Sequence, residues 1–288
     1  MNKITEIAPA KINFTLEIKN KRHDGYHNIY SVMQSVNLYD YITIKPSRKF
    51  EIISNNDDIP PIGENIITKA YLELKSITGI TDNVSIEIKK NIPIGSGLGG
   101  GSSDAAATLR ALNKLWELKL NLSELISIGI NIGSDVPFLI CGGCAIVTGK
   151  GDIIEQLPRP EIGNMIIFTP VNSYINKTKT MFNFVNKNHF SGGQKTKALG
   201  NSIKRKKFQY ELVSNVFSEI YTSNFDSKKN LVSHINKLGF YKTFMSGSGP
   251  SLYVFTENES ESYFIQVSKN NTKNINVNFV KPIDKFEL

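Results

Sequence analysis

The segment whose residue types point most directly to chemistry is a glycine-rich loop at residues 93–103, Pro-Ile-Gly-Ser-Gly-Leu-Gly-Gly-Gly-Ser-Ser. Glycine lets the backbone approach a ligand closely and adopt positive φ angles. A helix is expected from about residue 102 to 116, and the first N–H groups of a helix are unpaired and partly positive. Loop and helix terminus together predict a site for a di- or triphosphate. The alternative is a ligand-free turn, in which so many glycines would cost extra conformational entropy.

Two common phosphate-binding patterns do not account for this loop. A Walker A motif requires Lys-Ser or Lys-Thr after the last glycine, and neither is present. Gly95, Gly97 and Gly100 match the spacing of the dinucleotide fingerprint, but a run this rich in glycine satisfies many patterns by chance. That fingerprint also needs an acidic residue about 20 positions later at the end of a strand. Glu117 and Glu124 fall at a helix end and in a loop, so a nicotinamide oxidoreductase is disfavoured.

The elements that must position the loop follow from the hydrophobic pattern. Apolar and polar residues alternate at positions 11–19, which predicts a half-buried strand. Asn65 is the expected N-cap of a helix at 66–74. Further strands are expected at 29–36, 41–45, 84–89, 144–148, 165–169, 251–256 and 275–281, and further helices at 123–129, capped by Ser123, and at 208–220, 228–238 and 259–269. Strands and short helices without strict alternation predict an α+β fold in two halves.

Residues 149–160, rich in glycine, proline and charge, predict a domain boundary near residue 155. We therefore expect one domain at residues 1–155, containing the glycine loop, and a second at 156–288. The stretch 186–207 carries many Lys, Asn and Gly residues and is expected to be a mobile, solvated connection. Its basic run at residues 204–207 raises RNA binding as an alternative function. A lysine run without interleaved aromatic residues is more typical of a solvated face.

Composition restricts the remaining possibilities. The 288 residues include 34 Lys and Arg against 26 Asp and Glu, a net charge of +8 that suits an anionic ligand. No apolar run reaches the roughly 18 residues of a membrane span, and no targeting segment is recognisable, so a cytoplasmic protein without membrane partners is expected. The two cysteines, Cys141 and Cys144, form a CxxC pair without further metal ligands at suitable spacing. We expect both to be packed and reduced.

Three segments together resemble the GHMP small-molecule kinase superfamily. They are Ala-Pro-Ala-Lys-Ile-Asn at residues 8–13, the glycine loop followed by Asp-Ala-Ala-Ala at 104–107, and Ser-Gly-Ser-Gly-Pro-Ser at 246–251. Three more motifs, at residues 21–27, 133–138 and 149–152, narrow the resemblance to superfamily members whose acceptor carries a cytidine diphosphate group. Sister kinases acting on mevalonate, homoserine or a sugar share the glycine loop and remain the nearest alternatives.

The resemblance implies a fold, a reaction and a set of ligands. The first domain would be ribosomal-S5-like and the second a ferredoxin-like sandwich, with the active site between them. The reaction would be ATP-dependent phosphorylation of a hydroxyl group, with Mg²⁺ as cofactor and its protein ligands unassigned. The partner would be a small cytidine diphosphate substrate, with no nucleic acid, and the oligomeric state is left open.

The resemblance also implies two catalytic residues, Lys11 and Asp135. Asp135, in Gly-Ser-Asp-Val-Pro-Phe, would accept the proton of the acceptor hydroxyl. A lysine beside it would stabilise the developing oxygen charge. The alternatives are an exposed surface position for Lys11 and a helix N-cap ahead of Pro137 for Asp135.

The implied binding residues form two groups. The ATP group comprises Pro93, Ile94, Gly95, Ser96, Gly97, Leu98, Gly99, Gly100, Gly101, Ser102 and Ser103, with Lys90 and Asn65 bordering the adenosine. The acceptor group comprises Asn13, Tyr26, His27, Lys150, Tyr174 and Gly247. Among these, His27 would bind the cytosine edge, a tyrosine ring would stack on the base, and Lys150 would meet the diphosphate. Core or surface packing is the alternative for both tyrosines.

Overall fold

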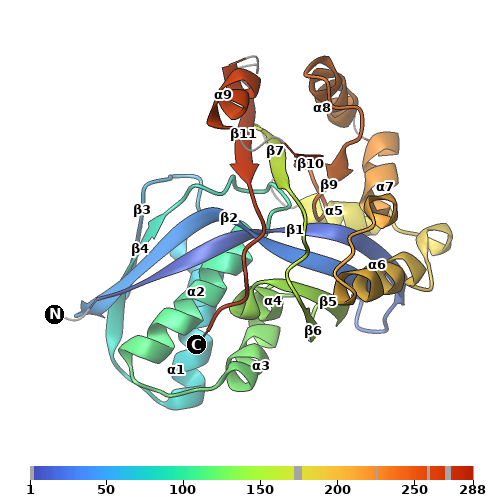
Figure 1. Ribbon diagram of the computed structural model, residues 1–288. Helices are drawn as coiled ribbons and strands as arrows, with labels where there is room; N and C mark the ends of the chain where they lie inside the picture. The colour runs from blue at the N-terminus through green and yellow to red at the C-terminus, as the bar shows by residue number, and fades with distance from the viewer. Residues whose placement is uncertain (1–2, 172–176, 225, 258–259, 270–273, 288) are drawn as a thin grey trace.

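The chain forms two β-sheets with helices packed against them (Figure 1). The computed structural model describes residues 3–171, 177–224, 226–257, 260–269 and 274–287. Within these residues one sheet has seven strands and the other has four. The expected α+β class is therefore confirmed.

The seven-stranded sheet is built on two long antiparallel strands, β1 (Ile4–Lys21) and β2 (His27–Ser47). The expected separate strands at 29–36 and 41–45 are thus one continuous strand. The first part of β2 pairs with β5 and the second part pairs with β4. The remaining bounds are β3 (Glu51–Ser54), β4 (Asn83–Lys89), β5 (Cys144–Gly149), β6 (Ile153–Leu157) and β8 (Ser214–Asn215).

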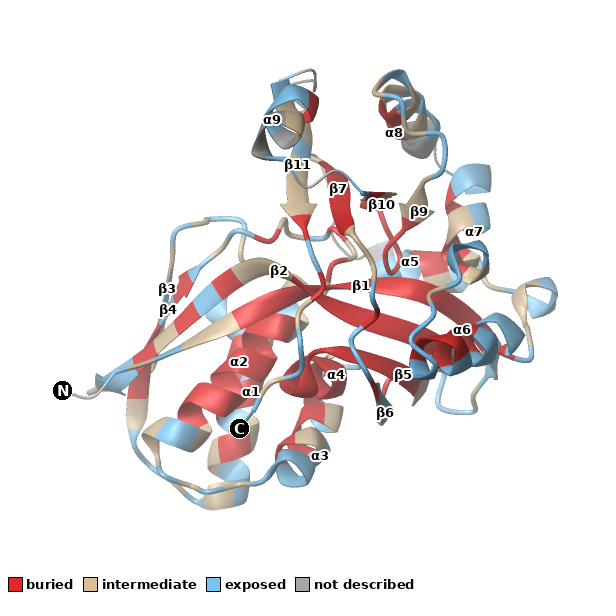
Figure 2. Ribbon diagram, in the orientation of Figure 1, coloured by how far each residue is buried: buried red, intermediate tan, exposed pale blue. Residues whose placement is uncertain are grey.

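Four helices pack together beside the β1–β2 pair: α1 (Ile66–Thr78), α2 (Gly100–Leu115), α3 (Leu122–Ile132) and α4 (Val136–Cys141) (Figure 1). The side chain of Asn65 accepts a hydrogen bond from Ile67 N at 3.0 Å, which confirms it as the N-cap of α1. The cap of α3 is Asn121 rather than Ser123, because Asn121 and Glu124 form a reciprocal capping box. Most of α2 is buried (Figure 2).

The four-stranded antiparallel sheet has the order β11-β7-β10-β9. Its bounds are β7 (Asn164–Pro170), β9 (Phe244–Met245), β10 (Leu252–Thr256) and β11 (Ile275–Val280), with nearby helices α5 (Lys177–Asn183), α7 (Val216–Asn224), α8 (Asp226–Lys237) and α9 (Glu261–Lys269). The chain passes from the first sheet to the second between residues 157 and 164, and β8 later pairs with β1. The domain boundary near residue 155 stays a proposal.

The stretch at residues 186–207 is an ordered part of the fold and not the mobile connection that its composition predicted. It contains η2 (Lys187–His189) and α6 (Gln194–Lys204), and the other short 3₁₀ segments are η1 (Ile62–Glu64) and η3 (Tyr210–Leu212). Leu199 and Ile203 of α6 are buried in a core cluster with Ile146. A side chain at Gly200 would meet Ile146 at 2.5 Å, so glycine permits close packing of helix and sheet. The many lysines of this stretch made the short apolar face of α6 difficult to recognise in the sequence.

The strand predicted to be half-buried, β1, is buried on both faces over its central part (Figure 2). Ile12 and Phe14 pack into a cluster that includes Met165 and Ile167 of the second sheet. The opposite, polar face is also covered: Lys11 is 3% exposed and Asn13 is 1% exposed. Polar residues at these positions therefore indicate a polar interior and not a solvent face.

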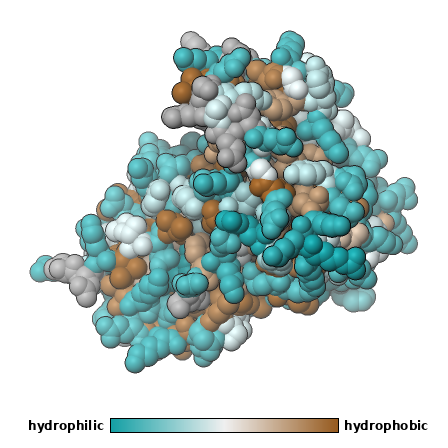
Figure 3. All heavy atoms as spheres, viewed as in Figure 1, coloured by the Kyte–Doolittle hydropathy of each residue, from teal (hydrophilic) through white to brown (hydrophobic). Residues whose placement is uncertain are grey.

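The face of the molecule in Figure 3 is mostly hydrophilic, with small hydrophobic areas scattered over it. Among the helices within the described residues, none is long and apolar enough to cross a membrane.

Candidate active site

Two glycine loops, at residues 95–101 and 246–251, pack backbone against backbone. The hydroxyl of Ser246 donates to Gly97 O at 3.1 Å, and Ser251 N donates to Ser96 O at 3.1 Å. A Cβ at Gly97, where φ is +81°, would lie 2.5 Å from Ser246 O. Only glycine fits this contact, since the nearest atoms belong to rigid backbone.

The N-terminus of α2 is open at this junction. Gly99 occupies the N-cap position with φ +74°, and no side chain caps the helix. The first N–H groups of α2 are therefore available to an anion, and the helix dipole favours negative charge there. This geometry suits the phosphate site predicted from the loop.

Lys11 and Asp135 meet beside the glycine loop. Lys11 Nζ donates to Asn13 Oδ1 at 2.8 Å and lies 3.4 Å from Asp135 Oδ2. Both lysine and asparagine come from β1, on alternate positions that face the same way. The ammonium is held almost without solvent contact, whereas the Asp135 side chain is 29% exposed. A carboxylate that is accessible on one side and paired on the other can receive a proton from a bound hydroxyl.

Asp135 stands at the N-cap position of α4, but its side chain makes no capping hydrogen bond. The helix-cap alternative is therefore wrong for this carboxylate, and the surface alternative is wrong for the buried Lys11. Leu139 N bonds to Asp135 O at 3.1 Å, so α4 fixes the backbone while leaving the carboxylate to Lys11.

The turn at residues 149–152 packs on the loop that carries Asp135. A Cβ at Gly151, where φ is +115°, would lie 2.2 Å from Ser134 O. Lys150 N is fixed by Asp152 Oδ1 at 2.8 Å, and Lys150 Nζ lies 5.7 Å from the centroid of the Tyr26 ring. The structure thus brings the predicted Lys150 and Tyr26 together, and the turn of Lys150 packs beside the loop of Asp135. Tyr26 is 56% exposed and able to cover a ligand.

His27 is buried against an aromatic residue that sequence reasoning missed. Its ring stacks on Phe182 of α5 with centroids 5.2 Å apart and planes 22° apart. Burial, together with the charge of Lys21, lowers the pKa of His27, so the imidazole is neutral at neutral pH. A neutral imidazole offers one donor and one acceptor, as recognition of a base edge requires. The predicted Tyr174 lies outside the described residues.

Lys90 lies beside the glycine loop but is already paired. Its ammonium forms ion pairs with Asp40 and with Asp104 of α2, the latter at 2.6 Å. Burial opposes the lysine charge, yet Asp104 and Asp40 raise the pKa of Lys90. The Asn65 side chain is engaged as the cap of α1. Contacts of these two residues with adenosine stay a prediction.

Asn215 of β8 is a second residue that the sequence did not indicate. Its Nδ2 donates to Met245 O and Gly247 O, each at 2.8 Å, and Gly247 N donates to Asn13 Oδ1 at 2.9 Å. Asn215 therefore holds the loop at residues 245–247, which reaches the polar face of β1.

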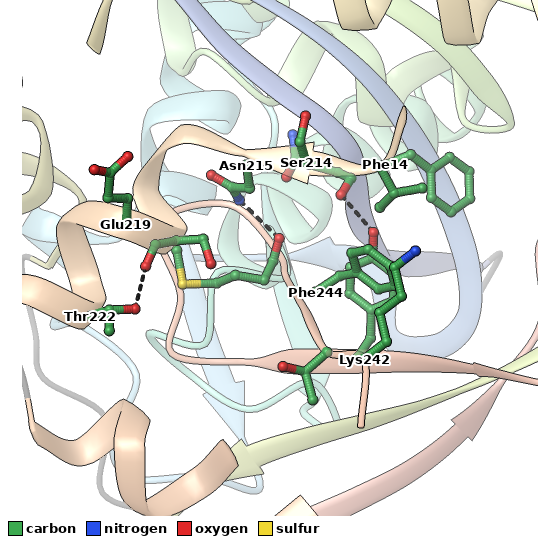
Figure 4. Close-up of a pocket in the computed structure, with 13 residues that line it drawn as sticks. Phe14, Ser214, Asn215, Glu219, Thr222, Lys242 and Phe244 are labelled. Carbon is green, nitrogen blue, oxygen red and sulfur yellow. Dashed lines mark hydrogen bonds between the residues drawn. The ribbon is translucent and has the colours of Figure 1, made fainter. Parts of the chain in front are cut away.

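Behind this loop is a cavity of about 440 Å³ (Figure 4). Glu219 and Lys242 contribute opposite charges to its lining.

The cysteines have no part in this site. Cys141 and Cys144 are free and buried, as expected, and burial raises the pKa of Cys141 to about 11. Among the described residues there is no group of three or more His, Cys, Asp and Glu that could hold a metal ion.

The profile described as "GHMP kinases N terminal domain" matches residues 65–143. A 4-diphosphocytidyl-2-C-methyl-D-erythritol kinase of a Geobacillus species is 37% identical over 257 residues, covering 88% of each chain. The protein of that name from Carboxydothermus hydrogenoformans is 38% identical, covering 87% of this chain and 88% of its own. A crystal structure of 4-(cytidine 5'-diphospho)-2C-methyl-D-erythritol kinase is similar in fold, with a TM-score of 0.77, 24% identity and coverage of 96% and 99%.

The sequence relatives and the fold show a small-molecule kinase of the GHMP type, with the two-domain fold that the resemblance implied. The homoserine kinase of Cytophaga hutchinsonii shares this fold at a TM-score of 0.73 and 18% identity, so fold alone does not separate the sister kinases. The chain belongs to the 4-diphosphocytidyl-2-C-methyl-D-erythritol kinase family.

Proposed function

We propose that the protein transfers the γ-phosphoryl group of ATP to the C2 hydroxyl of 4-diphosphocytidyl-2-C-methyl-D-erythritol, giving the 2-phosphate and ADP in the non-mevalonate route to isoprenoids. The observation that carries the proposal is the pairing of the buried Lys11 ammonium with the partly exposed Asp135 carboxylate, beside an uncapped, glycine-bounded helix terminus. The family membership narrows the acceptor. Free, buried thiols suit a cytoplasmic enzyme, which we include in the proposal.

The proposed reaction divides between the two members of the pair. Asp135 accepts the hydroxyl proton while the acceptor oxygen bonds to the γ-phosphorus and the bond to the ADP oxygen breaks. Lys11 stabilises the oxygen charge that develops during transfer. Asn13 holds the Lys11 ammonium at 2.8 Å, and so orients it. The backbone of the glycine loop and the first turn of α2 hold the phosphates.

Mg²⁺ is part of the proposal, and the residues present fit it. Mg²⁺ in such sites takes one or two protein ligands and completes its shell with phosphate oxygens and water, so a dedicated metal cage is not required. A methyl group at Gly133 would lie 4.0 Å from Ser102 Oγ, which places this hydroxyl near the loop of Asp135. Ser102 would hold the ion, together with phosphate oxygens and water. When bound, it neutralises phosphate charge.

The test is ADP release with a panel of acceptors. We expect little ATP hydrolysis without acceptor and rapid ADP release with 4-diphosphocytidyl-2-C-methyl-D-erythritol. Turnover of mevalonate or homoserine, without turnover of the cytidine compound, would contradict the proposal. ATP-dependent thermal stabilisation, compared with heparin binding across a salt series, separates the kinase from an RNA-binding protein.

Replacing Gly99 by Val should raise the KM for ATP about tenfold or more and lower kcat. The added side chain would keep the phosphates from the loop backbone and would displace Lys11. A Cβ here would lie 2.9 Å from Lys11 Cγ and would also stand at the phosphate-facing turn. Gly79→Val is the matched control: Gly79 has a similar φ of +71° and no atom within 4 Å of the added Cβ. It should cost stability only. Unchanged ATP affinity in folded Gly99→Val would place the phosphates elsewhere.

His27→Ala should raise the KM for the cytidine acceptor about tenfold to a hundredfold, equivalent to roughly 1–3 kcal/mol, and leave the KM for ATP near normal. Phe182→Leu should show the same selectivity. Because burial lowers the pKa of His27 below the ordinary value for an imidazole, the wild-type acceptor KM should not change around neutral pH and should rise only in acid, where the imidazole gains a proton. A loss of ATP affinity with a normal KM for the acceptor would mean that His27 lies in the ATP pocket and not in the acceptor pocket.

A further inference from the structure

Arg110 of α2 is a buried charge that no proposed step uses. Its side chain is 1% exposed. The guanidinium donates through Nε to Glu6 Oε2 at 3.1 Å, through Nη1 to Leu139 O at 2.9 Å and through Nη2 to Ile7 O at 2.7 Å. A single planar group therefore joins three elements, because it sits on α2 and bonds to both β1 and α4.

These are the elements that bring the catalytic pair together. Lys11 follows Ile7 by four residues on β1, and Asp135 precedes Leu139 by one turn at the start of α4. Helix α4 has only six residues, too few to hold its place by its own hydrogen bonds. Its position against β1, and with it the 3.4 Å contact between Lys11 and Asp135, depends on tertiary bonds.

The last described residues of the chain pack over the contacts of Arg110 with β1 and α4. Ile283 N donates to Ser35 O at 3.0 Å, and Phe286 N donates to Cys141 O, in the last turn of α4, at 2.8 Å. The Phe286 ring lies 4.1 Å from the Arg110 guanidinium carbon and against Gly142, the C-cap of α4. Phe286 thus covers the guanidinium and is bonded to the helix that Arg110 holds.

We propose that Arg110 and Phe286 are positioning residues for phosphoryl transfer: they fix α4 against β1 and so set Asp135 at Lys11. The inference rests on the function proposed above. Displacement of a catalytic group by about 1 Å can lower a rate about a hundredfold, so loss of these contacts should act on kcat. Substrate affinity should change little, since neither residue borders the loops that are proposed to bind ATP and the acceptor.

The experiment is a double-mutant cycle in kcat. Arg110→Lys and Phe286→Leu are each made alone and together with Asp135→Asn, and single-turnover rates are normalised to folded enzyme. We expect Arg110→Lys to lower kcat about tenfold and Phe286→Leu about threefold to tenfold, with both KM values within about twofold of wild type. In the Asp135→Asn background each should lower kcat less than about twofold, because the group that they position is already absent.

Leu231→Ala is the control for destabilisation, since Leu231 is buried in α8 and away from this connection. It should lower the melting temperature and leave kcat unchanged. Equal losses of kcat with and without Asp135, or normal kcat in folded Arg110→Lys and Phe286→Leu, would overturn the inference. If Arg110→Lys does not fold, the kcat of Phe286→Leu, with and without Asp135→Asn, is the test of the inference. An inactive wild type would instead refute the proposed function, so the two failures are distinguishable.

Discussion

Asp135→Asn is expected to lower kcat by about 10²–10⁴-fold, the range for loss of a general base. In the wild type, Lys11 Nζ lies 3.4 Å from the Asp135 carboxylate. Asparagine preserves the size of the side chain and can keep one oxygen toward Lys11, but it cannot accept the proton. No capping bond is lost, but the free energy of unfolding should fall somewhat, because asparagine removes the negative charge that faces the buried Lys11 ammonium. Steady-state kinetics and thermal unfolding of the same preparation measure both quantities.

Glu155→Gln is the matched control, because it also removes a carboxylate from a lysine pair, at an exposed position on β6. It should leave kcat unchanged. In the alternative mechanism Asp135 only orients the hydroxyl, and the proton leaves later on the phosphate. Asp135→Asn would then keep partial activity, and the pH–rate profile of the wild type would have no acidic limb. Full activity with normal pH dependence in the variant would remove Asp135 from the mechanism.

Lys11→Met is expected to lower kcat about 10²–10³-fold, as loss of one preorganised charge toward the transferring group does. Methionine keeps the apolar stem that packs beside Gly99 and removes only the ammonium. Because Asn13 Oδ1 also accepts from Gly247 N, the loop at 246–251 should stay in place. The effect should therefore appear in kcat with the KM values largely preserved.

The control for the lysine is Lys204→Met, since Lys204 of α6 also pairs with a carboxylate, that of Glu155, but is half-exposed and belongs to neither loop. It should retain wild-type kcat. If Lys11→Met also retained it, the buried ammonium would serve only to pair Asp135, and the charge stabilisation proposed for it would be wrong.

The meeting of Lys11, Asp135 and the two glycine loops could be predicted from the sequence because each lies in a short motif that resembles one of the GHMP kinases. Glycines at 97 and 151 are required where strands and loops touch without room for a side chain. The cap of α1, Asn65, is local. It depends only on neighbours in the chain, and local pattern is what a single sequence reports well.

Other residues of the site could not be predicted, because their neighbours are distant in the chain. Phe182 has the composition of an ordinary core residue, and only the fold places it on His27. Asn215 supports residues 245 and 247 through side-chain bonds that no periodicity indicates. The alternation in β1 predicted a solvated face, whereas tertiary packing turned that face into the polar interior where Lys11 and Asn13 lie.

The way in which the second half of the chain returns to the first has a consequence for unfolding. After the second sheet has begun, β8 pairs with β1, α6 packs against Ile146, and Phe286 bonds to Cys141. A fragment ending near residue 155 would thus expose the apolar face of β1 at Ile12 and Phe14 to water. Calorimetry should accordingly show one cooperative transition for the whole chain, and limited proteolysis near residue 155 should destroy both halves together and not release a stable N-terminal fragment.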